Sequence, residues 1–208
     1  QAEIDARVNI NADSLTWDVT EAEVNTAPLR NSTMSGDIGS GAWITSTSIT
    51  SGTASFGYNS TGGNPAPSYF HKATSAANKV ADIIFFTNQS FNYTLGIPGK
   101  VILAWDYEAF GNSIATTGNQ INITLFRPDG TTSVLDSVTF SSSVSWTRRI
   151  ISIGVNNFTQ NGTYVIQLRS RLLTAAKGTS NFVQVQFDNV FLNFTHYQLS
   201  VEHNSTIS

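Results

Sequence analysis

Two acidic residues in one short segment have the types and spacing best suited to acid–base chemistry. Asp106 and Glu108 lie in Trp105-Asp106-Tyr107-Glu108, where strand alternation puts both carboxylates on the same face. A glycosidase built on a β-sandwich can use such a pair, with one carboxylate as general acid and the other as nucleophile or base. The simpler interpretation is an outward polar face. Because no third acidic residue lies nearby in the sequence, we favour the simpler interpretation and expect neither a catalytic site nor an enzyme.

Residues that bind metals are too scattered to predict a metal site. His71, His196 and His203 are dispersed without metal-ligand spacing, and the chain has no cysteine. We expect these histidines on the surface or in loops, and we expect no cofactor. Asp188-Asn189 resembles the Asp-Asn of carbohydrate-binding jelly rolls, which can hold a structural calcium or a turn. The apolar phase shifts at this pair, so we favour a β-bulge over an ion site.

Asparagine sequons are a stronger feature, and they predict covalent modification. Nine Asn-X-Ser/Thr sequons occur, whereas 19 Asn and a total of 50 Ser and Thr in 208 residues give about 4.6 by chance. In Ile121-Asn122-Ile123-Thr124 the alternation turns the acceptor Asn to solvent, as N-glycosylation requires. We therefore expect N-glycans and an extracellular protein. The predicted acceptors are Asn31, Asn59, Asn88, Asn92, Asn122, Asn157, Asn161, Asn193 and Asn204.

Charge and hydropathy exclude two classes of partner. The chain has 11 basic and 14 acidic residues and a net charge of −3, so it lacks the basic surface that binds nucleic acid. No apolar run approaches the roughly 18 residues of a membrane span. The first residue is Gln1, and we interpret it as the mature end left by signal-peptide removal. Sparse ion pairing also predicts tolerance of low pH, because acid has few carboxylate interactions to disrupt.

Alternation with period two predicts strands along most of the chain, with no long helix. Arg127-Pro128-Asp129-Gly130 is a strong hairpin turn, and residues 181–194 form the longest predicted strand. The polar stretch 14–33 is interpreted as a connector that can include one helical turn around Val19 to Val24. The sequence therefore predicts an all-β, antiparallel β-sandwich of jelly-roll, pilin-like or Ig-like type over residues 34–208.

The first twelve residues alternate strictly between apolar and polar side chains. The polar set includes Glu3, Asp5 and Arg7, and the strand would run roughly 40 Å. Such a strand must bury its apolar face, either in its own sheet or in the groove of a neighbouring molecule. The second possibility makes residues 1–13 a donor strand. Its apolar positions are Ala2, Ile4, Ala6, Val8, Ile10 and Ala12.

The alternating N-terminal strand, the cysteine-free jelly-roll body and the nine sequons together resemble the subunit of the archaeal thread filament. The similarity covers the whole chain in character and length, and it depends on pattern rather than on a diagnostic motif. It implies a glycosylated cell-surface filament for adhesion or biofilm formation, in which the donor strand of one subunit inserts into the next. Identical subunits are then the partners, with other cells or surfaces as further contacts.

Two alternatives remain open from the residues. In a self-contained carbohydrate-binding or adhesin ectodomain, the N-terminal strand would pair within its own sandwich. Such a lectin should expose aromatic rings on one face, and its candidates are Trp17, Trp43, Trp105 and Trp146. A glycoside-active enzyme is the third hypothesis, and it depends on Asp106 and Glu108 alone.

Overall fold

Strands make up most of the described chain. The computed structural model describes residues 15–29, 34, 43–64, 67–94 and 98–205, and for 15–26 and 197–205 it describes only the backbone. Within these ranges eleven strands and one short 3-10 helix, η2 (Val155–Phe158), form two antiparallel sheets. A helix able to cross a membrane is not found among these residues. The predicted all-β antiparallel sandwich is confirmed.

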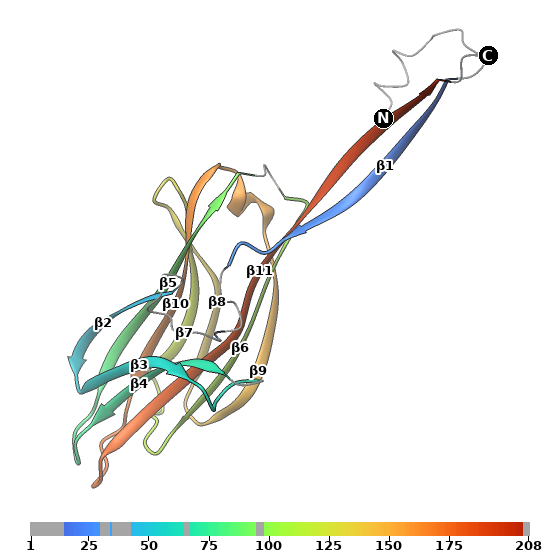
Figure 1. Cartoon of the computed structure of the whole chain (residues 1–208). Coiled ribbons are helices and arrows are strands. Elements are labelled where there is room, and N and C mark those ends of the chain that lie inside the picture. The colour runs from blue at the N-terminus through green and yellow to red at the C-terminus, as the bar shows by residue number, and fades with distance from the viewer. Residues whose placement is uncertain (1–14, 30–33, 35–42, 65–66, 95–97, 206–208) are drawn as a thin grey trace.

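The two sheets pack face to face, and β1 pairs with β11 beyond them (Figure 1). In spatial order, sheet A contains β3 (Thr53–Asn59), β4 (Ser68–Ser75), β11 (Asn181–Ser205), β6 (Lys100–Gly111) and β9 (Val144–Ile153), and β1 (Leu15–Thr26) pairs with the far end of β11. Sheet B contains β2 (Ile44–Ser51), β5 (Asp82–Tyr93), β10 (Gly162–Leu173), β7 (Asn119–Phe126) and β8 (Thr132–Phe140). At the two outer edges of the sandwich the chain passes directly between the edge strands of the two sheets, from β2 to β3 on one side and from β8 to β9 on the other.

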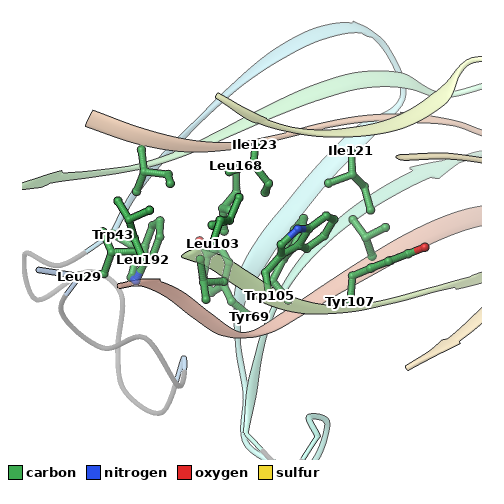
Figure 2. Close-up of a cluster of buried hydrophobic side chains, with 14 of the residues drawn as sticks. Leu29, Trp43, Tyr69, Leu103, Trp105, Tyr107, Ile121, Ile123, Leu168 and Leu192 are labelled. Atoms are coloured by element: carbon green, nitrogen blue, oxygen red, sulfur yellow. The ribbon is translucent and has the colours of Figure 1, made fainter. Parts of the chain in front are cut away.

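The core lies between the sheets and follows the alternation of the sequence. Figure 2 shows Leu103, Trp105, Ile123, Leu168 and Leu192 meeting there, and each is fully buried. Removing such side chains from water contributes roughly 1.5–3 kcal/mol each, which is the main stabilising contribution in a chain with so few charges.

The long strand β11 contains the predicted bulge. Its pairing with β6 shifts between Asp188 and Phe191, and Asn189 has a positive φ of 49°. Val185 and Phe187 are buried before the shift, and Leu192 is buried after it. The bulge interpretation of Asp188-Asn189 is confirmed.

Two segments differ from the sequence predictions. Residues 68–75 form β4, which the sequence analysis did not identify because Phe70 and Lys72 on its outer face hide the alternation of its buried residues. Residues 15–26, which lie within the predicted connector 14–33, form β1 and pair antiparallel with residues 194–205 of β11. Five β-branched residues in this stretch favour a strand over the helical turn proposed at Val19–Val24, and these are Thr16, Val19, Thr20, Val24 and Thr26.

Candidate functional site

The side of the sandwich that carries β2 and β3 is unusually open. β2 is the outermost described strand of sheet B and pairs only with β5, and β3 is the outermost of sheet A and pairs only with β4. Within the described residues, both strands therefore have one backbone edge without a partner strand, on the same side of the molecule. No residue of either strand is fully buried.

Apolar side chains on the inner faces of these two strands remain exposed. Ile49 lies opposite buried Ile83, and Phe56 lies opposite buried His71, so both side chains face the interior. Even so, Ile49 is 52% exposed, Phe56 44% and Tyr58 39%. We call this region the β2–β3 seam, and its inward residues are Thr45, Thr47, Ile49, Ala54, Phe56 and Tyr58.

A sharp turn fixes the closed end of the seam. Gly52 joins β2 to β3 with a φ of +92°, a conformation that favours glycine. A Cβ at this position would lie 2.5 Å from the Ala81 Cβ and 2.6 Å from the Thr74 carbonyl oxygen. A surface hollow beside the turn is lined by Ser51, Thr53, Thr74 and Val80 among others. The turn between the two edge strands is therefore packed closely against Thr74 and Ala81.

Beneath the seam, a chain of neutral polar groups connects the sheets. The His71 ring nitrogens lie 2.8 Å from Ser170 Oγ and 2.7 Å from Thr87 Oγ1, and Thr87 Oγ1 lies 2.7 Å from Thr45 Oγ1. Thr45 Oγ1 also lies 2.8 Å from the Tyr69 hydroxyl. The prediction of a surface or loop position is wrong for His71, which is fully buried and stacked 4.7 Å from Phe85. Burial lowers the pKa of His71 to about 3, so its ring is neutral at pH 7.

On the opposite side of the sandwich, an ion pair joins the edge strands β8 and β9. Asp136 lies on the inner face of β8 because a bulge shifts the β7–β8 register between Ile123 and Thr124. Arg149 of β9 donates to both of its carboxylate oxygens, at 2.7 and 2.6 Å, and the Trp105 indole donates at 2.9 Å. These bonds join sheet A to sheet B. We call this group the β8–β9 clamp, and hydrogen bonding to Asp136 raises the pKa of Arg149.

The predicted acidic pair does not form an open catalytic site. Asp106 is 2% exposed, and it accepts hydrogen bonds from Arg148 and from the Asn189 amide. Glu108 lies on the same outer face of sheet A, where burial raises its pKa. Asp106 is directly opposite Asp188, a pairing that spacing alone did not reveal.

Asp188 fastens a loop to this outer face. Its carboxylate accepts from the backbone N–H of Asn64 at 2.7 Å and of Asn189 at 2.7 Å. Burial, and more weakly the charge of Asp106, raises the pKa of Asp188. Every carboxylate oxygen of Asp106 and Asp188 has a protein donor, and the bond from the Asn64 N–H ties Asn64 to the bulge of β11. In the described chain no three His, Cys, Asp or Glu side chains gather as a metal site.

The predicted glycan acceptors that the structure describes lie at the surface. Asn88 and Asn92 of β5 and Asn122 of β7 point outward from sheet B, and Asn193 points outward from sheet A. Asn92, Asn161 and Asn193 are exposed, whereas Asn59, Asn88, Asn122 and Asn157 are half-buried. Asn31 and the side chain of Asn204 lie outside the described residues. N-glycosylation of all nine stays a prediction.

The other residues predicted for a lectin face or a donor strand are mostly buried or lie outside the described residues. Trp43 and Trp105 are buried, so they pack the core instead of forming a lectin surface, and Trp146 is half-buried. The side chain of Trp17 is not described. The predicted donor positions Ala2, Ile4, Ala6, Val8, Ile10 and Ala12 also lie outside the described residues.

The chain matches no family model and no curated protein sequence. Among solved structures it is similar to TmCBM61 in complex with β-1,4-galactotriose, at 12% identity and a TM-score of 0.45, over 80% of this chain and 97% of that one. It is also similar to a cyclase from Fischerella sp. TAU, at 17% identity and a TM-score of 0.49, over 89% and 100%. It is similar as well to a solved structure described as "CBM4 structure and function", at 12% identity and a TM-score of 0.41, over 84% of this chain and 99% of that one. At these identities the likeness concerns the β-sandwich fold.

Proposed function

We propose that the protein is a structural subunit of an extracellular filament, and that its β2–β3 seam accepts the N-terminal strand of a second copy. The observation that supports this proposal is the exposure of Ile49, Phe56 and Tyr58 on faces that point inward. A sandwich complete in itself would cover these side chains. Two free strand edges on the same side add unpaired backbone groups, which recruit a further strand.

The N-terminal sequence has the chemistry that this seam requires. Ile4, Val8 and Ile10 would pack against the exposed apolar side chains, contributing roughly 1.5–3 kcal/mol each when fully buried. The polar alternate positions would face solvent. An inserted strand can also pair its backbone with the free edge of β2 or β3. Repetition of one such head-to-tail contact produces an open fibre rather than a closed ring.

Electron microscopy of the full chain beside a variant lacking residues 1–12 tests the proposal. We expect fibres from the full chain and folded monomers from the truncated one. Adding a synthetic peptide of residues 1–13 to the truncated protein should raise its Tm. Fibres that form without residues 1–12 would overturn the proposal.

A matched pair of substitutions on one strand tests the acceptor. Ile49→Asp places a charge in the seam and should abolish fibres. Ile44→Asp changes the same residue type on the same strand, but Ile44 lies opposite outward Asn88 and is 69% exposed, so fibres should persist. Equal loss in both variants would mean that the β2–β3 seam is not the acceptor.

A carbohydrate-binding function is the second candidate, and aromatic residues on the outer face of sheet A favour it. Phe110 and Phe182 meet edge to face at 6.3 Å, and the Lys72 ammonium lies 4.8 Å from the Phe182 ring centroid. Half-buried rings beside a cation and Gln184 can stack on a sugar and hydrogen-bond its hydroxyls.

Glycan arrays probed with the full chain and with a Phe110→Ala, Phe182→Ala variant test this second function. Binding that disappears in the variant would support it, and fibre formation should be unchanged. No binding by either protein would remove it. Because these rings lie on the outer face and the seam residues face inward, the two experiments report on separate sites.

A further inference from the structure

The ribbon formed by β1 and the end of β11 places the N-terminal segment far from the seam of its own subunit. Residues 196–205 of β11 continue past the last pairing with β6, at Thr195, and pair with residues 15–24 of β1. Figure 1 shows this two-stranded ribbon projecting away from the sandwich, while β2 and β3 lie toward the opposite end.

The distance between the ribbon tip and the seam can be counted along β11, because β1 pairs with β11 and β3 pairs with β4, which pairs with β11. At the ribbon tip, Leu15 lies opposite Ser205. In the seam, Tyr58 lies opposite Tyr69, which lies opposite Phe187. Tyr58 is the seam residue of β3 nearest the ribbon, and eighteen positions separate Phe187 from Ser205. At about 3.3 Å per residue, the tip is about 60 Å from the near end of the seam.

The segment that precedes β1 cannot cover that distance and still insert. Ala12 is three residues from Leu15, so it stays within roughly 10 Å of the ribbon tip. Even Ala2 reaches at most about 47 Å when the chain is fully extended. Insertion also requires several consecutive residues to lie inside the seam. While β1 is paired with β11, residues 2–12 therefore cannot fill the seam of their own subunit.

We propose that the β1–β11 ribbon is a spacer that prevents self-insertion and so makes the occupant of the β2–β3 seam a second copy of the chain. The inference depends on the proposed strand-accepting function. The ribbon keeps the N-terminal strand and the seam of one subunit at opposite ends of the molecule. A subunit with an empty seam then stays available for extension, because it cannot close on itself.

Lengthening the segment between Ser14 and Leu15 tests the spacer. A flexible Gly/Ser linker of about 30 residues spans a root-mean-square distance of about 30 Å and about 100 Å when extended. Residues 2–12 could then reach their own seam at an effective concentration near 1 mM. At about 10 µM protein, the linker variant should form closed monomers in roughly 100-fold excess over fibres.

A linker of the same length at Gly130 serves as the control. Gly130 lies at the tip of the β7–β8 turn, and a Cβ added there meets no atom within 4 Å, so fibres should persist. Light scattering after size exclusion and electron microscopy give the ratio of monomer to fibre in each sample. If the Ser14–Leu15 linker variant still gives only fibres, the spacer inference is overturned. Loss of the proposed function has a different signature, which is fibre formation without residues 1–12.

Discussion

The two sides of the sandwich differ in how they join sheet A to sheet B. On the β8–β9 side, Asp136 on an edge strand binds Arg149 on the facing edge strand and Trp105 behind it. On the β2–β3 side, the cross-sheet bonds lie deeper, between His71 or Tyr69 of β4 and Thr45, Thr87 or Ser170 of sheet B. The β8–β9 clamp therefore joins the sheets at one edge of the sandwich. On the other side, the hydrogen bonds around His71 join them beneath the edge strands.

This difference shows how a sandwich keeps one side open without losing its core. The edge strands β2 and β3 leave the inward side chains of Ile49, Phe56 and Tyr58 partly exposed. His71 and its neighbours satisfy the polar groups beneath them, so the core stays ordered with the seam exposed. Closed and open sides should respond differently to acid, to substitution and to packing changes.

Acid should give the largest effect, and it should act on the open side. Burial holds the pKa of His71 at about 3, whereas the unfolded chain binds a proton near pH 6.5. As pH falls from 6.5 toward 3, the unfolded state gains the proton first, so the free energy of unfolding should fall by roughly 1.4 kcal/mol per pH unit. Urea unfolding of unassembled protein at several pH values measures this slope.

A His71→Gln variant separates this effect from other titrations. Glutamine keeps one donor and one acceptor but does not titrate, so the variant should be less stable at pH 7 and should not lose stability between pH 6.5 and pH 4. The raised pKa values of Glu108 and Asp188 act in the opposite direction, because their folded forms bind protons first. Asp82 contributes only near pH 4 and below, where the unfolded chain protonates this carboxyl first, because Arg171 holds its folded pKa below the ordinary value of 3.8. An unchanged slope in the variant would exclude His71 as the source.

Removing the clamp should give the next largest effect. Asp136→Ala leaves the buried Trp105 indole N–H without its acceptor and Arg149 without its partner. We expect a loss of about 3 kcal/mol in unfolding free energy, discounted because the Arg149 side chain is 38% exposed. Asp136→Asn keeps an acceptor for Trp105 and should lose less. If both variants are as stable as the parent, the β8–β9 side does not depend on this clamp.

Changing the turn that anchors the seam should cost somewhat less. In Gly52→Ala, the new Cβ would overlap the Ala81 Cβ and the Thr74 carbonyl oxygen at a φ of +92°. We expect a loss of about 2 kcal/mol and weaker fibre formation, because the closed end of the seam must shift. Gly130→Ala is the matched control, since Gly130 has a φ of +83° and open space around it, so only the backbone penalty of about 1 kcal/mol applies.

The sequence predicted the fold better than the distribution of burial within it. Alternation identified most strands and the bulge at Asp188-Asn189, and the Pro and Gly residues identified the Arg127–Gly130 turn. It missed β4 and placed His71 at the surface, because a histidine has no apolar signature and its burial depends on partners distant in sequence, Thr87 and Ser170. For this reason sparse charge predicts acid tolerance, whereas buried His71 predicts acid sensitivity.

Only one half of the candidate site, the N-terminal strand, could be predicted from the sequence pattern. Alternation over residues 1–12 predicts a strand in need of a groove, but the groove itself has no sequence pattern. Ile49 and Phe56 look like ordinary core residues in their strands, and their exposure follows from the position of β2 and β3 at the outermost edges of different sheets. The β1–β11 ribbon likewise depends on a pairing across about 180 residues.

The smallest predicted effect, that of Phe56→Ala, comes from a comparison of inward aromatic residues on edge strands of the two sides. Phe56 of β3 is 44% exposed and touches Phe85 edge to face at 6.4 Å, whereas Phe140 of β8 is 7% exposed. In unassembled protein, Phe56→Ala should cost about 1 kcal/mol and Phe140→Ala about 3 kcal/mol, because truncation of a side chain already in water loses less burial. Fibre yield should show the opposite order, with Phe56→Ala the more damaging change, since an inserted strand would cover Phe56 and not Phe140. Equal effects on stability would mean that Phe56 already belongs to the core, and the contrast between an open and a closed side would no longer hold.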